Sequence, residues 1–198
     1  MTLVLDVFSP PYFEYHGARL VDLPADKERF FVLDAIESSG NIAIRKKIAA
    51  SSLLKASPGT NAFPFVLPNI SGKKIRLRDY LGKVVLLDFW STGCAGCASF
   101  YKNILRSKIV PAFQHNSQLV IISICTDANK DMWEKSLKEE IFTDNDEINV
   151  YTDGKWFEHQ IITYYGLTGL PFVLLIDRSG TLLGDLTFLS AEQIIDKI

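Results

Sequence analysis

The chain has 198 residues, of which 47% are hydrophobic and 22% charged, which is enough apolar material for one packed domain and an appendage. A formal net charge of −2 gives no basic field for nucleic acid and no polybasic membrane patch, and no stretch approaches the roughly 20 consecutive apolar residues that span a bilayer. Three cysteines in a chain of this size exclude a small disulfide-stapled scaffold.

The first 57 residues differ in pattern from those that follow. Residues 23–40 predict an amphipathic helix, because Phe30, Leu33 and Ile36 fall on one face. Residues 41–57 predict a second helix, which ends at a Ser-Pro-Gly turn. We therefore expect a mainly helical N-terminal extension, residues 1–57, ahead of a separate domain, residues 58–198.

The second part alternates between predicted strands and helices. Two continuous apolar runs predict strands buried on both faces, and two further runs joined by an Arg-Ser-Gly turn predict an antiparallel hairpin. The predicted strands are residues 84–90, 118–126 and the two halves of 171–186. Helices are predicted from near Cys94, over 129–141 and 158–166, and from near Ser190. This order predicts an α/β fold with a mixed central β-sheet flanked by helices.

Two of the cysteines, Cys94 and Cys97, form a C-x-x-C pair in the segment "STGCAGC". A structural zinc site needs four ligands, and the chain has no second pair and only isolated histidines. A structural disulfide between these cysteines would close a very small loop and would therefore remove little entropy from the unfolded chain. We therefore expect no metal here.

A redox function fits the position of the pair better. Cys94 follows a buried strand and opens a helix, where backbone N–H groups and the helix dipole stabilise a thiolate. Cys97 lies one turn further on, within reach of a mixed disulfide formed at Cys94.

Three residues outside the pair support this function, although each has a simpler explanation. Asp88 is either a strand-end carboxylate in solvent or a desolvated acid that exchanges protons with the thiols. Trp90 is either ordinary core packing or part of the site. Pro171 opens a predicted strand, which a cis Leu170–Pro171 bond would explain, although few X-Pro bonds are cis.

Together these motifs resemble the thioredoxin superfamily, in particular its TlpA/ResA-like branch of thiol-disulfide oxidoreductases. "VVLLDFWSTGCAGC" is similar to the strand, Trp and C-x-x-C of that family, and "YGLTGLPFVLLIDRSG" is similar to its cis-proline strand. The lead-in "PGTNAFPFVLPNISGKKIRLRDYLGK" resembles that branch too. The resemblance runs from about Pro58 to the C-terminus.

The resemblance implies a thioredoxin-like fold and a role for each matching residue. Cys94 would be the attacking thiol, Cys97 the resolving thiol and Asp88 the buried acid. Leu170 and Pro171 would pair with an extended substrate segment. Trp90 and Gly93 would shape the substrate-binding surface. The resemblance implies no cofactor beyond the redox-active Cys94–Cys97 disulfide.

Several positions depart from the family pattern. Gly93 stands where a second Trp is usual, and Ala95-Gly96 replaces the common Gly-Pro between the cysteines. Glycine there is expected to loosen the start of the helix. The third cysteine, Cys125, lies in an apolar strand and is expected to be an inert buried thiol. Asp127 and the run Asp144–Glu147 predict a solvated acidic loop.

The leading hypothesis is a thiol-disulfide oxidoreductase that exchanges its dithiol with protein disulfides. One alternative is a non-catalytic thioredoxin-fold binding module, which could handle copper through the cysteine pair. The other alternative is a thiol peroxidase. Peroxiredoxins carry a threonine three residues before the peroxidatic cysteine, whereas Thr92 lies two residues before Cys94. No cation flanks the pair in the sequence, which favours a reductant.

The expected partners are protein thiols or disulfides and an upstream electron donor, with no nucleic acid. The resemblance implies the periplasm or cell envelope of a bacterium. The opening residues lack the features of a signal peptide, which fits either a cytosolic protein or, if the protein works in the cell envelope, the C-terminal part of a longer precursor.

Overall fold

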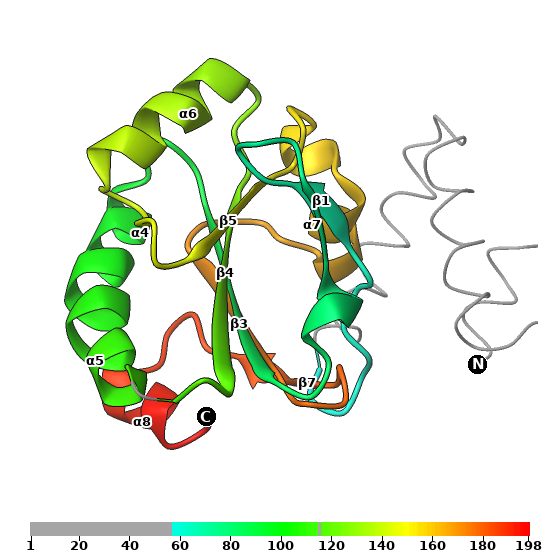
Figure 1. Cartoon of the computed structure of the whole chain (residues 1–198), viewed down its shortest axis with the longest axis vertical. Coiled ribbons are helices and arrows are strands. Elements are labelled where there is room, and N and C mark those ends of the chain that lie inside the picture. The colour runs from blue at the N-terminus through cyan, green and yellow to red at the C-terminus, as the bar shows by residue number, and fades with distance from the viewer. Residues whose placement is uncertain (1–56, 115) are drawn as a thin grey trace, which may run out of the picture. The chain divides into compact units, whose positions relative to one another are not determined.

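The computed structural model describes residues 57–114 and 116–198 (Figure 1). The helices predicted in the first 57 residues, and the extension they would form, lie outside the described residues apart from Ser57.

A five-stranded mixed sheet forms the centre of the described domain, in the order β5-β4-β3-β6-β7. Its strands are β3 (Val84–Trp90), β4 (Leu119–Cys125), β5 (Ile148–Tyr151), β6 (Phe172–Ile176) and β7 (Leu182–Asp185). β3, β4 and β5 run parallel, whereas β6 runs antiparallel to both β3 and β7. The predicted mixed sheet and the C-terminal hairpin are thereby confirmed.

A two-stranded antiparallel hairpin precedes the sheet. It consists of β1 (Val66–Pro68) and β2 (Lys74–Arg76), and the short helix η2 (Leu77–Tyr80) follows it. A bridge between Asn69 and Val150 connects the end of β1 to β5.

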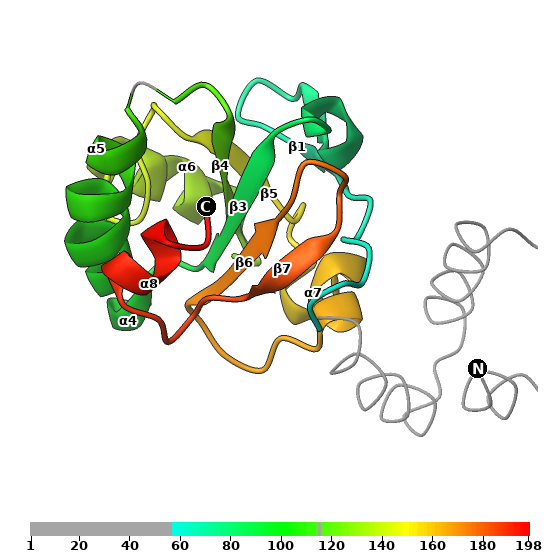
Figure 2. The ribbon, with the colours of Figure 1, turned by 90° about the horizontal axis from the view of Figure 1, so that it is seen from below.

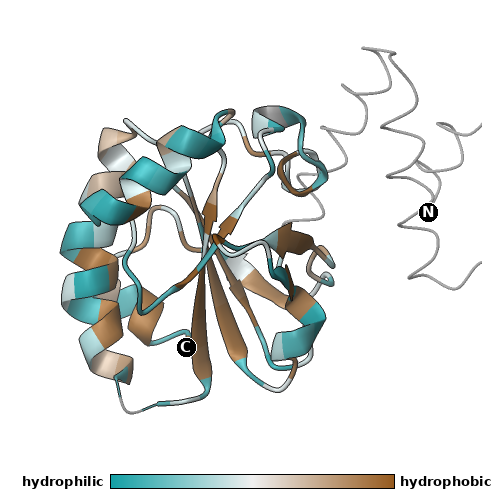
Figure 3. Cartoon of the chain, turned by 45° about the horizontal axis from the view of Figure 1, so that its top comes forward, coloured by the Kyte–Doolittle hydropathy of each residue, from teal (hydrophilic) through white to brown (hydrophobic). Residues whose placement is uncertain are grey.

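Helices cover both faces of the sheet (Figures 1 and 2). On one face lie α4, α5, α6 and α8, and on the other lie α7 and the β1–β2 hairpin. The bounds are α4 (Ala95–Phe100), η3 (Tyr101–Ile109), α5 (Val110–Phe113), α6 (Lys130–Glu139), η4 (Trp156–Glu158), α7 (Gln160–Tyr165) and α8 (Ala191–Ile195). This layering buries the apolar strands on both sides, as Figure 3 shows by hydropathy.

The helix boundaries follow from local signals. The Asn129 side chain accepts hydrogen bonds from the N–H groups of Asp131 and Met132 at the start of α6. Ser190 forms a capping box with Gln193 at the start of α8. Gly166, with φ 65°, ends α7 in the left-handed conformation that glycine adopts at little cost.

The helix after the cysteine pair differs from an ordinary α-helix. α4, η3 and α5 follow one another without a break, and η3 has π-helical geometry. Pro111 lies in the last turn and has no N–H to donate, and the Val110 N–H bonds to the Leu105 carbonyl, five residues back. The widened segment still packs Tyr101, Leu105 and Ile109 into the core.

Two apolar clusters fill the face that carries α4 and α6. The first joins strand residues such as Leu86 and Val173 to η3 and α8. The second surrounds Trp90 and includes Cys97 and Trp133 of α6. Because alternate strand residues share a face, Asp88 lies on this same face between Leu86 and Trp90.

Candidate active site

The cysteine pair lies at the carboxyl end of β3, at the start of α4. Cys94 is the N-cap of α4 and is joined to Cys97 by a disulfide, with the two Cα atoms 5.3 Å apart. The Cys97 N–H donates to the Cys94 Sγ over 3.1 Å. Cys94 is half-buried, whereas Cys97 is only 2% exposed. The sulfur that a substrate can reach is therefore that of Cys94, and a backbone donor is in place for its thiolate.

The two glycines of this segment have specific backbone roles. Gly93 has φ +83°, a conformation that strains any residue with a side chain. A Cβ atom at Gly96 would lie 3.0 Å from Cδ of Pro171, closer than carbon atoms normally approach. Glycine therefore allows the turn at Gly93 and the close packing at Gly96, which is a better explanation than a loosened helix.

Leu170 and Pro171 lie directly beside this helix start. The bond between them is cis, and both side chains are half-buried. Contact with Gly96 brings the Pro171 ring against the C-x-x-C turn, although the two segments are 75 residues apart in the chain. The structure thus brings together the cysteine pair and the proline that the sequence linked only by resemblance.

Asp88 is buried in the sheet beneath the site. Its side chain is 1% exposed, and Oδ1 has no hydrogen-bond partner among the described residues. Burial raises its pKa from 3.8 to about 8, because the charged form has lost its solvent. A carboxyl with a pKa near neutrality can both take up and return a proton.

Trp90 lies on the same strand face as Asp88, at the end nearer the cysteines. It is fully buried, stacks on Phe142 at 4.9 Å between ring centroids, and donates its Nε1–H to the Ser123 Oγ at 2.7 Å. It belongs to the same apolar cluster as Cys97 and Cys125. Trp90 therefore supports the site from beneath and offers no exposed surface to a substrate.

The prediction of a solvated acidic loop is wrong for three of its residues. Asp127, Asp144 and Glu147 are at most 8% exposed, although Asp146 faces solvent. Asp127 accepts hydrogen bonds from the N–H and the hydroxyl of Thr92, two residues before Cys94. These contacts hold the turn that leads to Cys94, and the acidic sequence alone did not indicate them.

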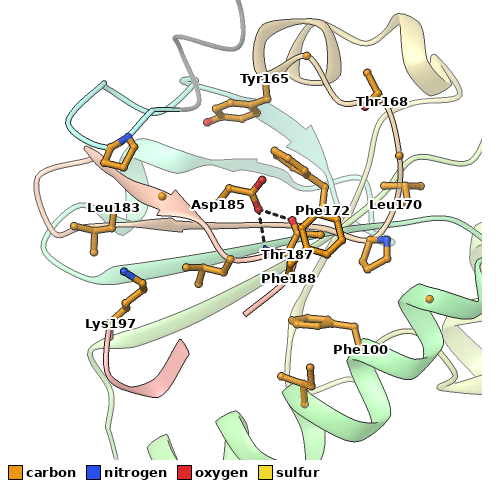
Figure 4. Close-up of a pocket in the computed structure, with 18 of the residues that line it drawn as sticks. Phe100, Tyr165, Thr168, Leu170, Phe172, Leu183, Asp185, Thr187, Phe188 and Lys197 are labelled. Carbon is orange, nitrogen blue, oxygen red and sulfur yellow. Dashed lines mark hydrogen bonds between the residues drawn. The ribbon is translucent and has the colours of Figure 1, made fainter. Parts of the chain in front are cut away.

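A groove of about 930 Å³ opens beside the site (Figure 4). Gly96, Leu170 and Pro171 line it near the cysteines, with Phe100 from α4 and Phe172 from β6. It continues along β7 to Phe188, whose side chain is 96% exposed. The groove presents mainly apolar surface and reaches the cysteine segment at Gly96, although neither cysteine lines it.

Cys125 is fully buried, as expected, and burial raises the pKa of its thiol far above the ordinary value. Among the described residues, no group of three or more histidine, cysteine or acidic side chains could hold a metal ion. No helix in the described part of the chain is long and apolar enough to cross a membrane.

Residues 82–182 match the family model described as thioredoxin-like, which spans both the cysteine pair and the proline strand. The chain belongs to the thioredoxin-like family. The matched range includes every residue that the sequence assigned to the site, from Asp88 to Pro171.

Curated relatives carry the name thiol-disulfide oxidoreductase ResA. The protein from Geobacillus thermodenitrificans is 29% identical over 124 residues, which cover 62% of this chain and 64% of that protein. The chain thus spans somewhat less than two thirds of this relative. The protein from Bacillus thuringiensis subsp. konkukian is 28% identical over 73% of this chain and 80% of its own.

Solved structures share the fold. The thioredoxin domain of a thiol-disulfide oxidoreductase from Bacteroides vulgatus has a TM-score of 0.60 at 23% identity, over 71% of this chain and 94% of that domain. A thioredoxin-like protein from Bacteroides caccae has a TM-score of 0.64 at 23% identity, over 86% of this chain and 61% of its own. The thioredoxin-like fold and the TlpA/ResA-like resemblance are confirmed.

Proposed function

We propose that this thioredoxin-like protein is a thiol-disulfide oxidoreductase that reduces protein disulfides with the Cys94–Cys97 dithiol. The observation that carries the proposal is the asymmetry of the pair. Cys94 is accessible and capped by a backbone N–H, whereas Cys97 is buried in the cluster above Asp88.

In the proposed reaction the Cys94 thiolate attacks one sulfur of the substrate disulfide. That disulfide breaks, its leaving sulfur takes a proton from solvent, and a mixed disulfide remains at Cys94. Cys97 then gives its thiol proton to the Asp88 carboxylate and attacks the Cys94 Sγ. The second substrate sulfur leaves and takes the proton from Asp88. The substrate has gained two electrons and two protons, and the Cys94–Cys97 disulfide has formed.

The groove supports an extended polypeptide as the substrate. Its apolar lining begins at Gly96, Leu170 and Pro171 and leads away from Cys94. We propose that the backbone at Leu170 pairs with the substrate segment that carries the disulfide, as the family resemblance implies.

Insulin reduction with dithiothreitol as the electron donor tests the activity. Cys94→Ser should abolish the reduction, because no attacking thiol remains. Cys125→Ser is the matched control and should retain it, since that thiol is fully buried. Full activity of the Cys94→Ser protein would refute the mechanism.

The direction of electron flow has its own test. Equilibrium titration against glutathione, read by tryptophan fluorescence, should give a reduction potential close to that of thioredoxin, about −270 mV. A value near about −120 mV, typical of a strong oxidant, would overturn the assignment as a reductant.

We further propose that the protein works in the periplasm or cell envelope of a bacterium, where an upstream electron donor returns its disulfide to the dithiol. The likeness to the ResA proteins supports this location. Fractionation of cells that express the gene from its own promoter should find the protein outside the cytoplasm, and a purely cytoplasmic signal would contradict the proposal.

A further inference from the structure

A row of polar side chains crosses the buried face of the sheet beneath the active site. Asp88 of β3 is in register with Ser123 of β4, which is in register with Asn149 of β5. Residues in register on parallel strands point to the same face, so these three side chains form one row. Glu147 directly precedes β5, and its carboxylate lies beside the Asn149 end of the row, because the Thr143 hydroxyl is within 2.7 Å of both side chains.

Glu147 is held at the end of this row by neighbouring groups. The Thr143 hydroxyl lies 2.7 Å from the Glu147 Oε2 and 2.7 Å from the Asn149 Oδ1. The Asn149 amide donates to the Glu147 and Asp144 carbonyls, at 3.3 and 2.6 Å. The Glu147 side chain is therefore fixed in place, and the residue is 7% exposed.

Both acids of the row have an unsatisfied oxygen. The Asp88 Oδ1 and the Glu147 Oε1 are buried, and neither has a hydrogen-bond partner among the described residues. An ionised carboxylate in such a position is costly, and two of them on one buried face also repel each other.

The nearby cation Arg106 relieves only part of this cost. Arg106 of η3 is half-exposed and lies 3.2 Å from Asp144 and 3.3 Å from Asp146. Asp144 also accepts a hydrogen bond from the Tyr101 hydroxyl, at 3.0 Å. The cation of this region is therefore already engaged by two other carboxylates.

Electrostatics agrees with this geometry. Burial raises the pKa of Glu147 well above its ordinary value, and the charges of Asp88 and Asp144 add to the rise, whereas the Thr143 hydroxyl and the charge of Arg106 oppose it. Coulomb repulsion is mutual, so an ionised Glu147 also disfavours the ionised form of Asp88.

We propose that Asp88 and Glu147 act as one coupled pair that shares a proton, with Glu147 as a positioning residue that sets when Asp88 can accept the proton of Cys97. With one proton in the pair, one carboxyl is neutral and the other is a base. When Cys97 gives up its thiol proton, the pair becomes doubly protonated and uncharged. It returns to the singly protonated form when that proton passes to the leaving substrate sulfur.

The role in exchange rests on the proposed function, but the coupling itself is measurable without any substrate. The side-chain carboxyl carbons of the oxidised protein are ¹³C-labelled and titrated by NMR in the wild type, Glu147→Gln and Asp88→Asn. In the wild type both carboxyls should report two shared steps. The last proton should leave the pair at least about one pH unit above the single step of either variant.

Asp146→Asn is the matched control, because that carboxylate neighbours Glu147 in sequence and its side chain is 75% exposed. It should leave both steps in place. The coupling would be overturned if the second titration step of the wild type had the same pKa as the single step of either variant. Since Asp88→Asn gives the reciprocal measurement, the test does not depend on the folding of the Glu147 variant.

The pH profile of single-turnover insulin reduction then tests the role in exchange. The limb that rises with pH, as Asp88 ionises and can accept the Cys97 proton, should move down by about one pH unit in Glu147→Gln and stay in place in Asp146→Asn. If the NMR coupling is present but the profile does not move, the pair does not serve the exchange step. A wild-type protein that reduces no insulin would instead refute the proposed function and leave the NMR result standing.

Discussion

At the scale of single residues, the sequence identified the chemistry better than the surroundings. Cys94, Cys97 and Asp88 could be singled out because a C-x-x-C pair follows an apolar strand that contains an acid, and their catalytic roles stay predictions. Glu147 and Asp127 were missed because they stand in polar segments, where solvent exposure is the usual expectation. Their burial depends on tertiary contacts, such as the Thr92 turn around Asp127, that no local pattern contains.

Burial of Asp88 has a consequence for stability. The folded protein holds the Asp88 proton up to a pH of about 8, whereas the unfolded chain releases it near 3.8. The native state therefore binds more protons between these values, and the free energy of unfolding should fall as pH rises, by up to roughly 1.4 kcal/mol per pH unit from this residue.

Chemical denaturation of the oxidised protein from pH 4 to 8 checks this expectation. In the Asp88→Asn protein the free energy of unfolding should fall less steeply with pH, and at pH 8 this variant should be more stable than the wild type. Asp79→Asn, which changes a half-exposed surface carboxyl, should follow the wild-type curve. A wild-type stability that rose across this range would contradict the assigned state of Asp88.

At the scale of the elements, the helix starts and four strands of the central sheet were predicted, whereas β5 was not. The run of residues 84–90 is β3 to the residue, because a continuous apolar stretch with β-branched residues has few other structures open to it. The π-helical geometry of η3 was not predicted, since its apolar residues also fit an ordinary amphipathic helix. A π-helix differs from an α-helix in its backbone hydrogen bonds, such as that from the Val110 N–H to the Leu105 carbonyl, and hydrophobic periodicity does not report these.

The contact between α4 and the proline segment gives a prediction at this scale. Gly96→Ala would place a Cβ atom 3.0 Å from the Pro171 Cδ, so α4 and Pro171 must move apart. Overpacking typically costs about 1–3 kcal/mol, and the higher helix propensity of alanine offsets at most about 1 kcal/mol of that. We expect a net loss of stability together with slower insulin reduction.

Gly169→Ala is the control for this substitution. A Cβ atom there meets nothing within 4 Å, so its thermal midpoint should be unchanged or slightly higher. Equal midpoints for the two variants in thermal unfolding would show that the Gly96–Pro171 contact does not constrain the site.

At the scale of the whole molecule, topology assembles what the sequence keeps apart. The parallel order of β3 and β4 and the antiparallel return of β6 bring the proline strand beside the cysteine strand. The sequence predicted a mixed sheet but not the order of its strands. The groove was not predicted at all, because α4, β6, β7 and the segment after β7 each contribute only part of its lining.

The groove leads to a prediction about substrate binding. Phe188 is 96% exposed and lines the groove, so its side chain adds little to folding and is available to a substrate. Phe188→Ser should raise the KM for insulin several-fold and leave the thermal midpoint within about 1 °C.

Val66→Ser is the control for this substitution. It also removes an exposed apolar side chain, but Val66 lies on β1 and does not line the groove. Its KM should equal that of the wild type. Equal KM values for all three proteins would mean that polypeptide substrates bind elsewhere.

The central claim is that Cys94 attacks and Cys97 resolves, and trapping of the mixed disulfide tests it most directly. The reduced Cys97→Ser protein is mixed with oxidised insulin and analysed by peptide mass spectrometry. We predict a stable adduct in which an insulin cysteine is joined to Cys94, because the resolving thiol is gone. The reduced Cys94→Ser protein should form little or none, since Cys97 is buried. An adduct through Cys97 or Cys125, or equal trapping by both variants, would contradict the account.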